Sequence, residues 1–393
     1  MPARISFPEV PVHPDLFKIL RGYASLVSPH HLQIPFHLEA QAIHDFFVLH
    51  ILTSAHFKTY PPAVQYQKAF WKWTIPHLEK SIGEADPDLE LEVDARVYNH
   101  YLGLLNFSGD PQAPGLTGER PPAESYITHF WRGDAEAHPD GLVDLNTYET
   151  TTLLEARTLV EGGTTGLRTW RAARVLAAHL VRNPALVQHT RILELGAGSG
   201  FLGCVVAALQ LGSPRHKAAS STGALWLSDI NDTVLARCRD NLRLTCNSSS
   251  AHPSTRCVFL DWAAALEPDP EPLASLLHDK IDADLILGAD IVFDPYLIPA
   301  LVGVLRLALQ PRSHLRERSA LIALTIRNPA TMQQFIEAVL ASGLILENLP
   351  PETKAAHDQV FGQPGEESGG DASSGVYIYR ITSRPTSVAT SAI

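Results

Sequence analysis

The chain has 393 residues, 45% of them hydrophobic, and a formal net charge of −11 at pH 7. A chain of this length and apolar content can bury a full α/β domain together with a smaller one, so we expect two structural units. The excess of acidic residues leaves no stripe of Lys and Arg to neutralise phosphates, which argues against nucleic-acid binding and favours a basic protein surface as a partner.

The N-terminal quarter alternates amphipathic helical patterns with turns that contain proline, so residues 1–105 are predicted to form an all-α region. The helical patterns cover Asp15–Leu26, His37–Phe57, Ala63–Leu78 and Asp94–Leu105. Residues 106–141 are dense in Pro, Gly and acidic residues and predict a linker. The larger unit is expected over residues 142–382, before a disordered polar tail at 383–393.

The larger unit alternates apolar strand patterns with helical patterns, which predicts an α/β fold with a doubly wound, parallel sheet. A strand at 147–154 and a helix at 167–182 come first. Strand–helix pairs then begin at Thr190, Ala224, Thr255, Ala283 and Ser319, and a last strand covers Gly375–Ile381. Two polar segments, Gly212–Gly223 and 362–374, predict a solvated insertion and a loop.

Glycine recurs at every second position after the strand that begins near Thr190. At Gly196, Gly198 and Gly200 the missing Cβ permits unusual φ/ψ values and close approach of a ligand, and the helix that follows favours an anionic group at its N-terminus. A dinucleotide loop needs its third glycine where Phe201 stands, and a P-loop needs Gly-Lys-Ser/Thr after the glycines. The G-x-G-x-G spacing therefore favours S-adenosylmethionine over NAD. A plain strand-to-helix turn is the other interpretation.

Two later strands end in acidic residues that suit a nucleoside. Asp229 follows the strand Ala224–Ser228, at the place where an acid binds a ribose diol in open α/β sheets; its alternative role is to cap the next helix. The strand Cys257–Leu260 leads into Asp261 and Trp262, which offer a carboxylate for the adenine amino group and an indole for its flat face. The indole could instead cover the edge of the sheet.

The run Asp284–Phe293 begins with the uninterrupted apolar pattern of a central parallel strand that is covered on both faces. This strand ends in Asp290. Because ligands bind at the carboxyl ends of parallel strands in this architecture, Asp290 is the acid best placed for chemistry.

Together these segments resemble the seven-strand, S-adenosylmethionine-dependent protein lysine methyltransferases that have an Asp-x-x-Phe/Tyr motif after strand four. The resemblance extends over about residues 145–382 and rests on the glycine loop, Asp229, Asp261-Trp262 and Gly288–Phe293. Within that group, the branch that methylates translation elongation factor 2 is the most similar. That similarity lies in Gly162–Trp170, in Thr325–Pro329 and, more loosely, in the N-terminal segment Tyr60–Tyr66 with the aromatic helix after it.

The resemblance implies a Rossmann-like sheet of seven strands with an antiparallel last strand, S-adenosyl-L-methionine as cofactor, and elongation factor 2 as the protein substrate. Asp290 would hold the lysine amine by a hydrogen bond, and Phe293 would wall the lysine channel. The residues assigned to the cofactor are Glu194, Gly196, Ala197 and Gly198 at its methionine part, Asp229 at the ribose, Asp261 and Trp262 at the adenine, Ala289 at its back wall, and Trp170.

Two other functions are compatible with the pattern. A methyltransferase of the same fold could act on another protein, a small molecule or nucleic acid. Enzymes that methylate the amino groups of DNA bases usually have Asn/Asp-Pro-Pro-aromatic after strand four, where this chain has Asp290-Ile291-Val292-Phe293. An NAD-dependent oxidoreductase would lack its third glycine.

No metal site is predicted, because no histidine has the H-E-x-x-H or Cys/His spacing of a zinc site. The four cysteines, at positions 204, 238, 246 and 257, show no C-x-x-C pairing, which favours reduced thiols and a cytoplasmic location. No apolar run approaches the ~20 residues that span a bilayer, and no export signal is apparent, so no membrane contact is expected. The oligomeric state stays open, with a monomer as the expectation.

Overall fold

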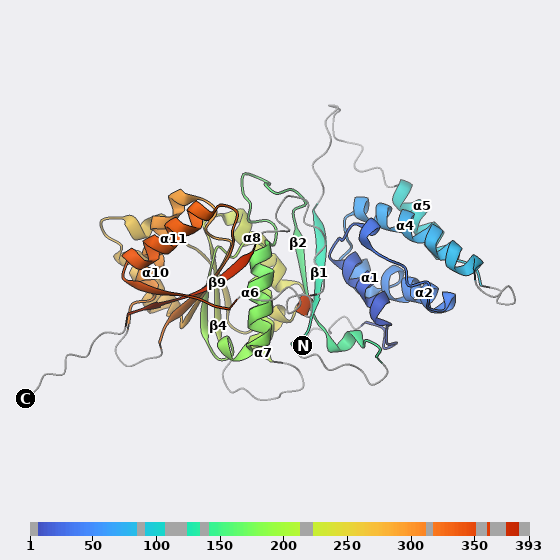
Figure 1. The fold of residues 1–393 in the computed structure, drawn as a ribbon, viewed down its shortest axis with the longest axis horizontal. Coiled ribbons are helices and arrows are strands. Elements are labelled where there is room, and N and C mark those ends of the chain that lie inside the picture. Colours follow the sequence, from blue (N-terminus) through green and yellow to red (C-terminus); the bar gives the residue numbers. More distant parts are fainter. Residues whose placement is uncertain are drawn as a thin grey trace, which may run out of the picture. The chain divides into compact units, whose positions relative to one another are not determined.

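The computed structural model describes residues 7–84, 91–106, 124–133, 141–212, 223–311, 317–350, 360–361 and 375–384. The chain forms two compact units (Figure 1). The first comprises Met1–Glu161 with Asp358–Ser368, and the second comprises Gly162–His357 with Gly369–Ile393. The division therefore falls at Gly162, about 20 residues later than the start of the larger unit that the composition predicts.

The first unit contains the predicted helices. They are α1 (Pro14–Ala24), α2 (Ala40–Phe46), the π-helical turn η2 (Phe47–Leu52), α3 (Ala55–Thr59), α4 (Val64–Gly83) and α5 (Ala95–Asn106). Their apolar faces meet in an aromatic core, in which Tyr23 packs on Phe57 and Phe70 with ring centroids 5.1 and 4.5 Å apart. Burial of such rings is the main favourable contribution to the stability of this unit.

The first unit extends beyond residues 1–105, the region that is predicted to be all-α. It also contains an antiparallel pair of strands, β1 (Ser125–Trp131) and β2 (Glu149–Glu155), which are paired along their whole length. Strand β1 lies inside the predicted linker, and β2 is the strand predicted at 147–154. Because β2 pairs with β1, it belongs to this unit and not to the large sheet, which is why the division between the units lies after it.

The second unit is built on a sheet of seven strands in the order β5-β4-β3-β6-β7-β9-β8. The strands are β3 (Arg191–Leu195), β4 (Ala224–Asp229), β5 (Thr255–Phe259), β6 (Leu285–Ala289), β7 (Ser319–Thr325), β8 (Leu344–Asn348) and β9 (Val376–Ser383). Strands β3 to β7 pair in parallel, and β9 pairs antiparallel with both β7 and β8. The predicted Rossmann-like sheet of seven strands with an antiparallel last strand is confirmed.

One strand of this sheet was not predicted. β8 is a five-residue edge strand in which Leu344 is buried and Ile345 is exposed. It follows Gly343, whose φ of +84° ends the helix before it. Because β8 is short and half-exposed, its alternation is too brief to separate it from the preceding helical pattern. It supplies the seventh strand, the place that the prediction gave to residues 147–154.

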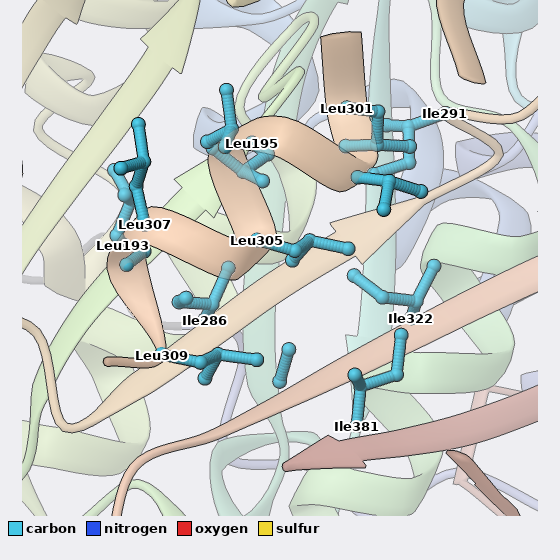
Figure 2. Close-up of a cluster of buried hydrophobic side chains, with 14 of the residues drawn as sticks. Leu193, Leu195, Ile286, Ile291, Leu301, Leu305, Leu307, Leu309, Ile322 and Ile381 are labelled. Carbon is cyan, nitrogen blue, oxygen red and sulfur yellow. The ribbon is translucent and has the colours of Figure 1, made fainter. Parts of the chain in front are cut away.

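Helices flank the sheet of the second unit. They are α6 (Arg171–Arg182), α7 (Phe201–Leu211), α8 (Asp232–Arg243), α9 (Glu271–Ser275), α10 (Ile298–Ala308) and α11 (Pro329–Ala341). Figure 2 shows how α10 packs on the sheet. Its Leu301, Leu305 and Leu307 share one buried cluster with Leu193, Ile286 and Ile322 from three strands. Strand residues alternate between faces, so Glu194, next to Leu193 on β3, points to the other face.

The order in which successive strands are added to the sheet reverses at β3. From β3 it proceeds through β4 to β5, and then crosses back to β6 on the other side of β3. Such a switch point leaves a crevice beyond the carboxyl ends of the two central strands, where ligands bind in open α/β sheets.

Several predicted features lie outside the described residues: most of the 106–141 linker, the Gly212–Gly223 insertion, the 362–374 loop and most of the 383–393 tail. Across the part of the chain that the structure describes, no helix combines the length and the apolar character needed to cross a lipid bilayer. The four cysteines are free thiols, three of them buried.

Candidate active site

A cavity of about 440 Å³ lies at the switch point of the second unit. We call it the switch-point cavity. It opens where β3, β4 and β6 end, because the carboxyl ends of parallel strands meet at one edge of a sheet. All eleven predicted site residues line it: Trp170, Glu194, Gly196, Ala197, Gly198, Asp229, Asp261, Trp262, Ala289, Asp290 and Phe293.

The glycine loop connects β3 to α7 and has the backbone that glycine permits. Gly196 and Gly200 have φ values of +62° and +89°. A Cβ at Gly196 would lie 2.9 Å from Ile291 Cγ2, and one at Gly200 would lie 2.9 Å from Cys238 Sγ. Because both the backbone conformation and the available space exclude a side chain, these two positions require glycine.

Glu194 lies beneath this loop and is 3% exposed. A Cβ added to Gly203 of α7 would lie 3.2 Å from its Oε2, so the carboxylate faces the first turns of that helix. Oε2 has no hydrogen-bond partner among the described residues. Burial raises the pKa of Glu194 to about 8; the charges of Cys257 and Asp229 act in the same direction, and the Gly203 N–H opposes them. A buried carboxylate oxygen without a donor is a site for a hydrogen-bonding cation.

Asp229 is the last residue of β4, and both of its carboxylate oxygens face the cavity loops. Its Oδ2 accepts a hydrogen bond from the Gly198 N–H at 3.3 Å, and its Oδ1 accepts one from the Asn231 N–H at 3.1 Å. The cap of α8 is Asn231, whose side chain accepts from the first N–H groups of that helix. The alternative in which Asp229 caps the helix is therefore wrong. Burial raises the pKa of Asp229.

Asp261 and Trp262 follow β5 at the same edge of the sheet. Asp261 Oδ1 accepts from the Ala263 N–H at 2.9 Å and so begins the 3₁₀ turn η6 (Trp262–Leu266). The half-buried Trp262 indole packs against the core and lies close to the loop, since its Cζ2 would be 3.8 Å from a Cβ on Gly196. The indole thus packs against the core and lines the cavity at the same time.

Asp290 follows β6, and its carboxylate accepts hydrogen bonds from two other segments of the chain. Its Oδ1 accepts from the Thr325 N–H at 2.9 Å, and its Oδ2 accepts from the Thr325 hydroxyl at 3.1 Å and the Ala172 N–H at 3.2 Å. Its φ of +53° is unusual for a residue with a side chain. The carboxylate thus joins the ends of β6 and β7 to the start of α6.

Trp170 lies directly before α6, and its ring contacts two arginine guanidinium groups and donates one hydrogen bond. The guanidinium of Arg327 lies 4.9 Å from its ring centroid, and that of Arg168 lies 5.6 Å away. The indole N–H donates to the Thr165 carbonyl at 3.0 Å. Arg327 also lies 3.6 Å from Asp290 Oδ2, so one cation contacts both an aromatic ring and a buried carboxylate.

Exposed apolar side chains ring the mouth of the switch-point cavity, and the sequence reasoning missed most of them. Phe293, Ile230 and Leu266 are 57–59% exposed, and Tyr296 is 91% exposed. Ile230 directly follows Asp229, and Tyr296 lies three residues after the Asp-x-x-Phe motif, so adjacency to the predicted strand ends could have identified them. An apolar rim of this kind indicates contact with another molecule.

The fold and the site together resemble those of a Rossmann-like methyltransferase domain. Residues 152–341 match a protein-family model described as lysine methyltransferase. This match confirms the resemblance that the motifs predict, together with S-adenosyl-L-methionine as the cofactor of the domain.

Individual relatives have names of the same kind. Protein-lysine N-methyltransferase EEF2KMT from Bos taurus is 32% identical over 220 residues, 54% of this chain and 60% of that protein. Protein-lysine N-methyltransferase EFM3 from Chaetomium thermophilum is 34% identical, over 54% of this chain and 59% of that protein. The chain thus spans about 60% of the length of these relatives. Among solved structures, a TehB-like SAM-dependent methyltransferase from Corynebacterium glutamicum is 17% identical over 53% of this chain and 87% of that chain, with a TM-score of 0.33.

Proposed function

We propose that this chain is a protein-lysine N-methyltransferase that uses S-adenosyl-L-methionine and acts on translation elongation factor 2. The observation that supports it most is the switch-point cavity, in which a glycine loop, an unpaired buried carboxylate oxygen and an apolar rim meet. The family match over residues 152–341 and the names of the relatives support the lysine and the protein substrate.

The residues of the cavity fit the cofactor chemically. Glu194 Oε2 lacks a donor, and the amino group of the methionine part is a cation that would supply one. Asp229 would accept hydrogen bonds from the ribose hydroxyls, while Asp261 and Trp262 would face the adenine and Ala289 would line its back wall. When bound, the cofactor supplies an electrophilic methyl group on a sulfonium.

The protein's task at the lysine is to bind a neutral amine and to align it. A lysine side chain in water has a pKa of ~10.4, so it must lose a proton to become a nucleophile. The aromatic rings of Trp170, Phe293 and Tyr296 at the cavity offer an apolar surface, which favours the neutral amine and release of the proton to solvent. Alignment in such a channel can lower the barrier by up to ~7–11 kcal/mol.

Asp290 is proposed to hold this amine. A carboxylate has about four acceptor positions, and Thr325 and Ala172 take up three of them. Arg327 lies beside Asp290 Oδ2 and over Trp170, which supports the idea that a cationic or amine group is accommodated between this carboxylate and this ring. Binding of the lysine would then require Arg327 to move aside.

The experiment that tests the proposal is methylation of purified elongation factor 2 with isotope-labelled S-adenosylmethionine, read out by mass spectrometry of its peptides. The Asp229→Ala variant is the control for cofactor-dependent transfer. We expect label on one lysine with the natural protein and little label with the variant. If a cell lysate shows label on another protein or on a small molecule but none on elongation factor 2, the alternative of a different methyl acceptor is correct.

A further expectation is that the protein is cytoplasmic and monomeric and does not bind nucleic acid directly.

A further inference from the structure

A second cavity of the second unit lies along β5, at the edge of the sheet, and has a volume of about 530 Å³. We call it the edge cavity. It is bordered by β5, the C-terminal half of α8, the 3₁₀ turn η5 (Ser248–Ala251) and the π-helical turn η7 (Leu276–Ile281). None of the residues that line it also lines the switch-point cavity, so the two are separate. Its volume is typical of sites for small molecules.

Four cationic side chains from three elements line the edge cavity. They are Arg239 and Arg243 of α8, Arg256 of β5 and Lys280 of η7, and all four are exposed. No acidic residue is among those that line the cavity. In a chain with 42 acidic and 31 basic residues, four cations without one acid form a distinct local charge.

These cations repel one another. Arg239 and Arg243 are one helical turn apart, a spacing at which like charges destabilise a helix. Arg256 and Lys280 both lie over the ring of Trp226, with distances of 5.1 and 6.0 Å to its centroid. Within the described residues, none of the four forms an ion pair with a carboxylate. An anion in the cavity would remove this repulsion.

Two uncharged rings at the edge cavity, those of His252 and Trp226, are not available to bind a ligand. The ring of His252 is occupied, because Nε2 pairs with Gln210 and Nδ1 accepts from the Ser254 N–H, and burial lowers its pKa to about 4. Because Arg256 and Lys280 lie over the Trp226 ring, this ring is not available to stack on a nucleobase. Recognition therefore rests on charge and on the forked donors of arginine, which match phosphate oxygens.

We propose that the edge cavity binds a compact polyphosphate, that is, the phosphate chain of a nucleoside di- or triphosphate or an inorganic oligophosphate. The phosphate oxygens would contact Arg239 and Arg243 on one side and Arg256 and Lys280 on the other. The net charge of the whole chain does not oppose this, because charges beyond about 8 Å are largely screened at physiological salt. The proposal does not depend on the methyltransferase function.

Binding of inorganic tripolyphosphate and of ATP to the full chain tests the proposal by calorimetry at 150 mM salt, with S-adenosylhomocysteine present to fill the switch-point cavity. We expect saturable binding of both below millimolar concentration, with affinities within a few-fold. The double variant R239Q/R243Q and, independently, R256Q should weaken both at least tenfold. The matched control is R306Q, an exposed arginine on α10 outside both cavities, and it should bind as the natural protein does.

Cys257 gives a second readout because it lines the edge cavity and is the only one of the four cysteines that is not buried. Contact with the Cys238 thiol and the charges of Arg239 and Arg243 lower its pKa. A bound polyphosphate would offset those charges, so alkylation of Cys257, measured by peptide mass spectrometry, should slow. Four results would each overturn the proposal. They are the absence of saturable tripolyphosphate binding, equal binding by the arginine variants and the natural protein, binding of ATP but not of tripolyphosphate, and tighter binding of a glutamate-rich peptide or an RNA strand.

Discussion

The unpaired Oε2 oxygen of Glu194 leads to a prediction about proton release on cofactor binding. Its pKa of about 8 means that the side chain is mostly neutral at pH 7 while the cavity holds no cation. A ligand ammonium at Oε2 would stabilise the ionised form, so cofactor binding should expel the proton. With a pKa of about 8, about 0.9 of a proton is bound at pH 7 and would be released per cofactor bound.

The same shift predicts how stability depends on pH. The pKa of Glu194 rises from 4.5 to about 8, a change of about 3.5 units, which at 1.36 kcal/mol per unit corresponds to about 5 kcal/mol. The folded protein binds more protons than the unfolded chain between these two values. The free energy of unfolding should therefore fall as pH rises from about 4.5 to about 8 and change no further above that through this group.

Glu194→Gln is the perturbation that tests both effects, because it keeps the shape and removes the titration. Calorimetric titration with S-adenosylmethionine in buffers of different ionisation enthalpy measures the protons released, and urea unfolding across pH 5 to 9 measures the stability. The variant should release no proton from this site and show a flatter pH profile. Glu337→Gln, an exposed position on α11, is the matched control and should behave as the natural protein. Equal proton release by the natural protein and Glu194→Gln would refute the reasoning.

Three further outcomes concern the other cavity residues. Asp229→Ala should weaken S-adenosylmethionine binding by roughly 2–4 kcal/mol in calorimetry, the scale of hydrogen bonds to a charged partner; unchanged affinity would restrict Asp229 to fixing the loop. Phe293→Ala should raise the KM for the protein substrate about tenfold and leave cofactor affinity unchanged, because the ring is exposed at the cavity mouth. Asp290→Ala should lower turnover about 10²-fold or more with cofactor affinity within a few-fold, and Asp290→Asn should lie between; normal turnover of a folded, cofactor-bound Asp290→Ala protein would exclude Asp290 from the site.

The elements that the sequence predicts well are those whose pattern is local and long. The central strand β6 is a continuous apolar run, and β3 and β4 are mostly apolar. The glycine loop after β3 is a regular spacing of single residues, so the strands and the loop can be recognised without knowledge of the fold. The pairing of β1 with β2 depends on two segments separated by the 17 residues 132–148, whose composition is irregular. Their assignment to the first unit therefore could not follow from either segment alone.

The net charge of the sequence also fails to reveal a feature that only the fold creates. A charge of −11 describes the chain as a whole, and it argued against nucleic-acid binding because no stripe of Lys and Arg is present. The four cations of the edge cavity are spread over residues 239–280 and form no basic run in the sequence. Only the packing of α8 and η7 beside β5 brings them together, so the local field is a property of the fold rather than of the composition.

The sequence predicts the position of Asp290 correctly, but its role in catalysis does not follow from that position. The sequence placed an acid at the end of the fourth parallel strand, and it lines the switch-point cavity. Its bonds to Thr325 and Ala172 were not predictable, because they depend on where β7 and α6 begin and end in space. Since removing the carboxylate frees two buried N–H groups, Asp290→Ala combines a loss of stability with any loss of chemistry. Asparagine tolerates the positive φ of this residue and keeps an acceptor, so the difference between the two variants in turnover at equal folded fraction isolates the contribution of the charge to catalysis.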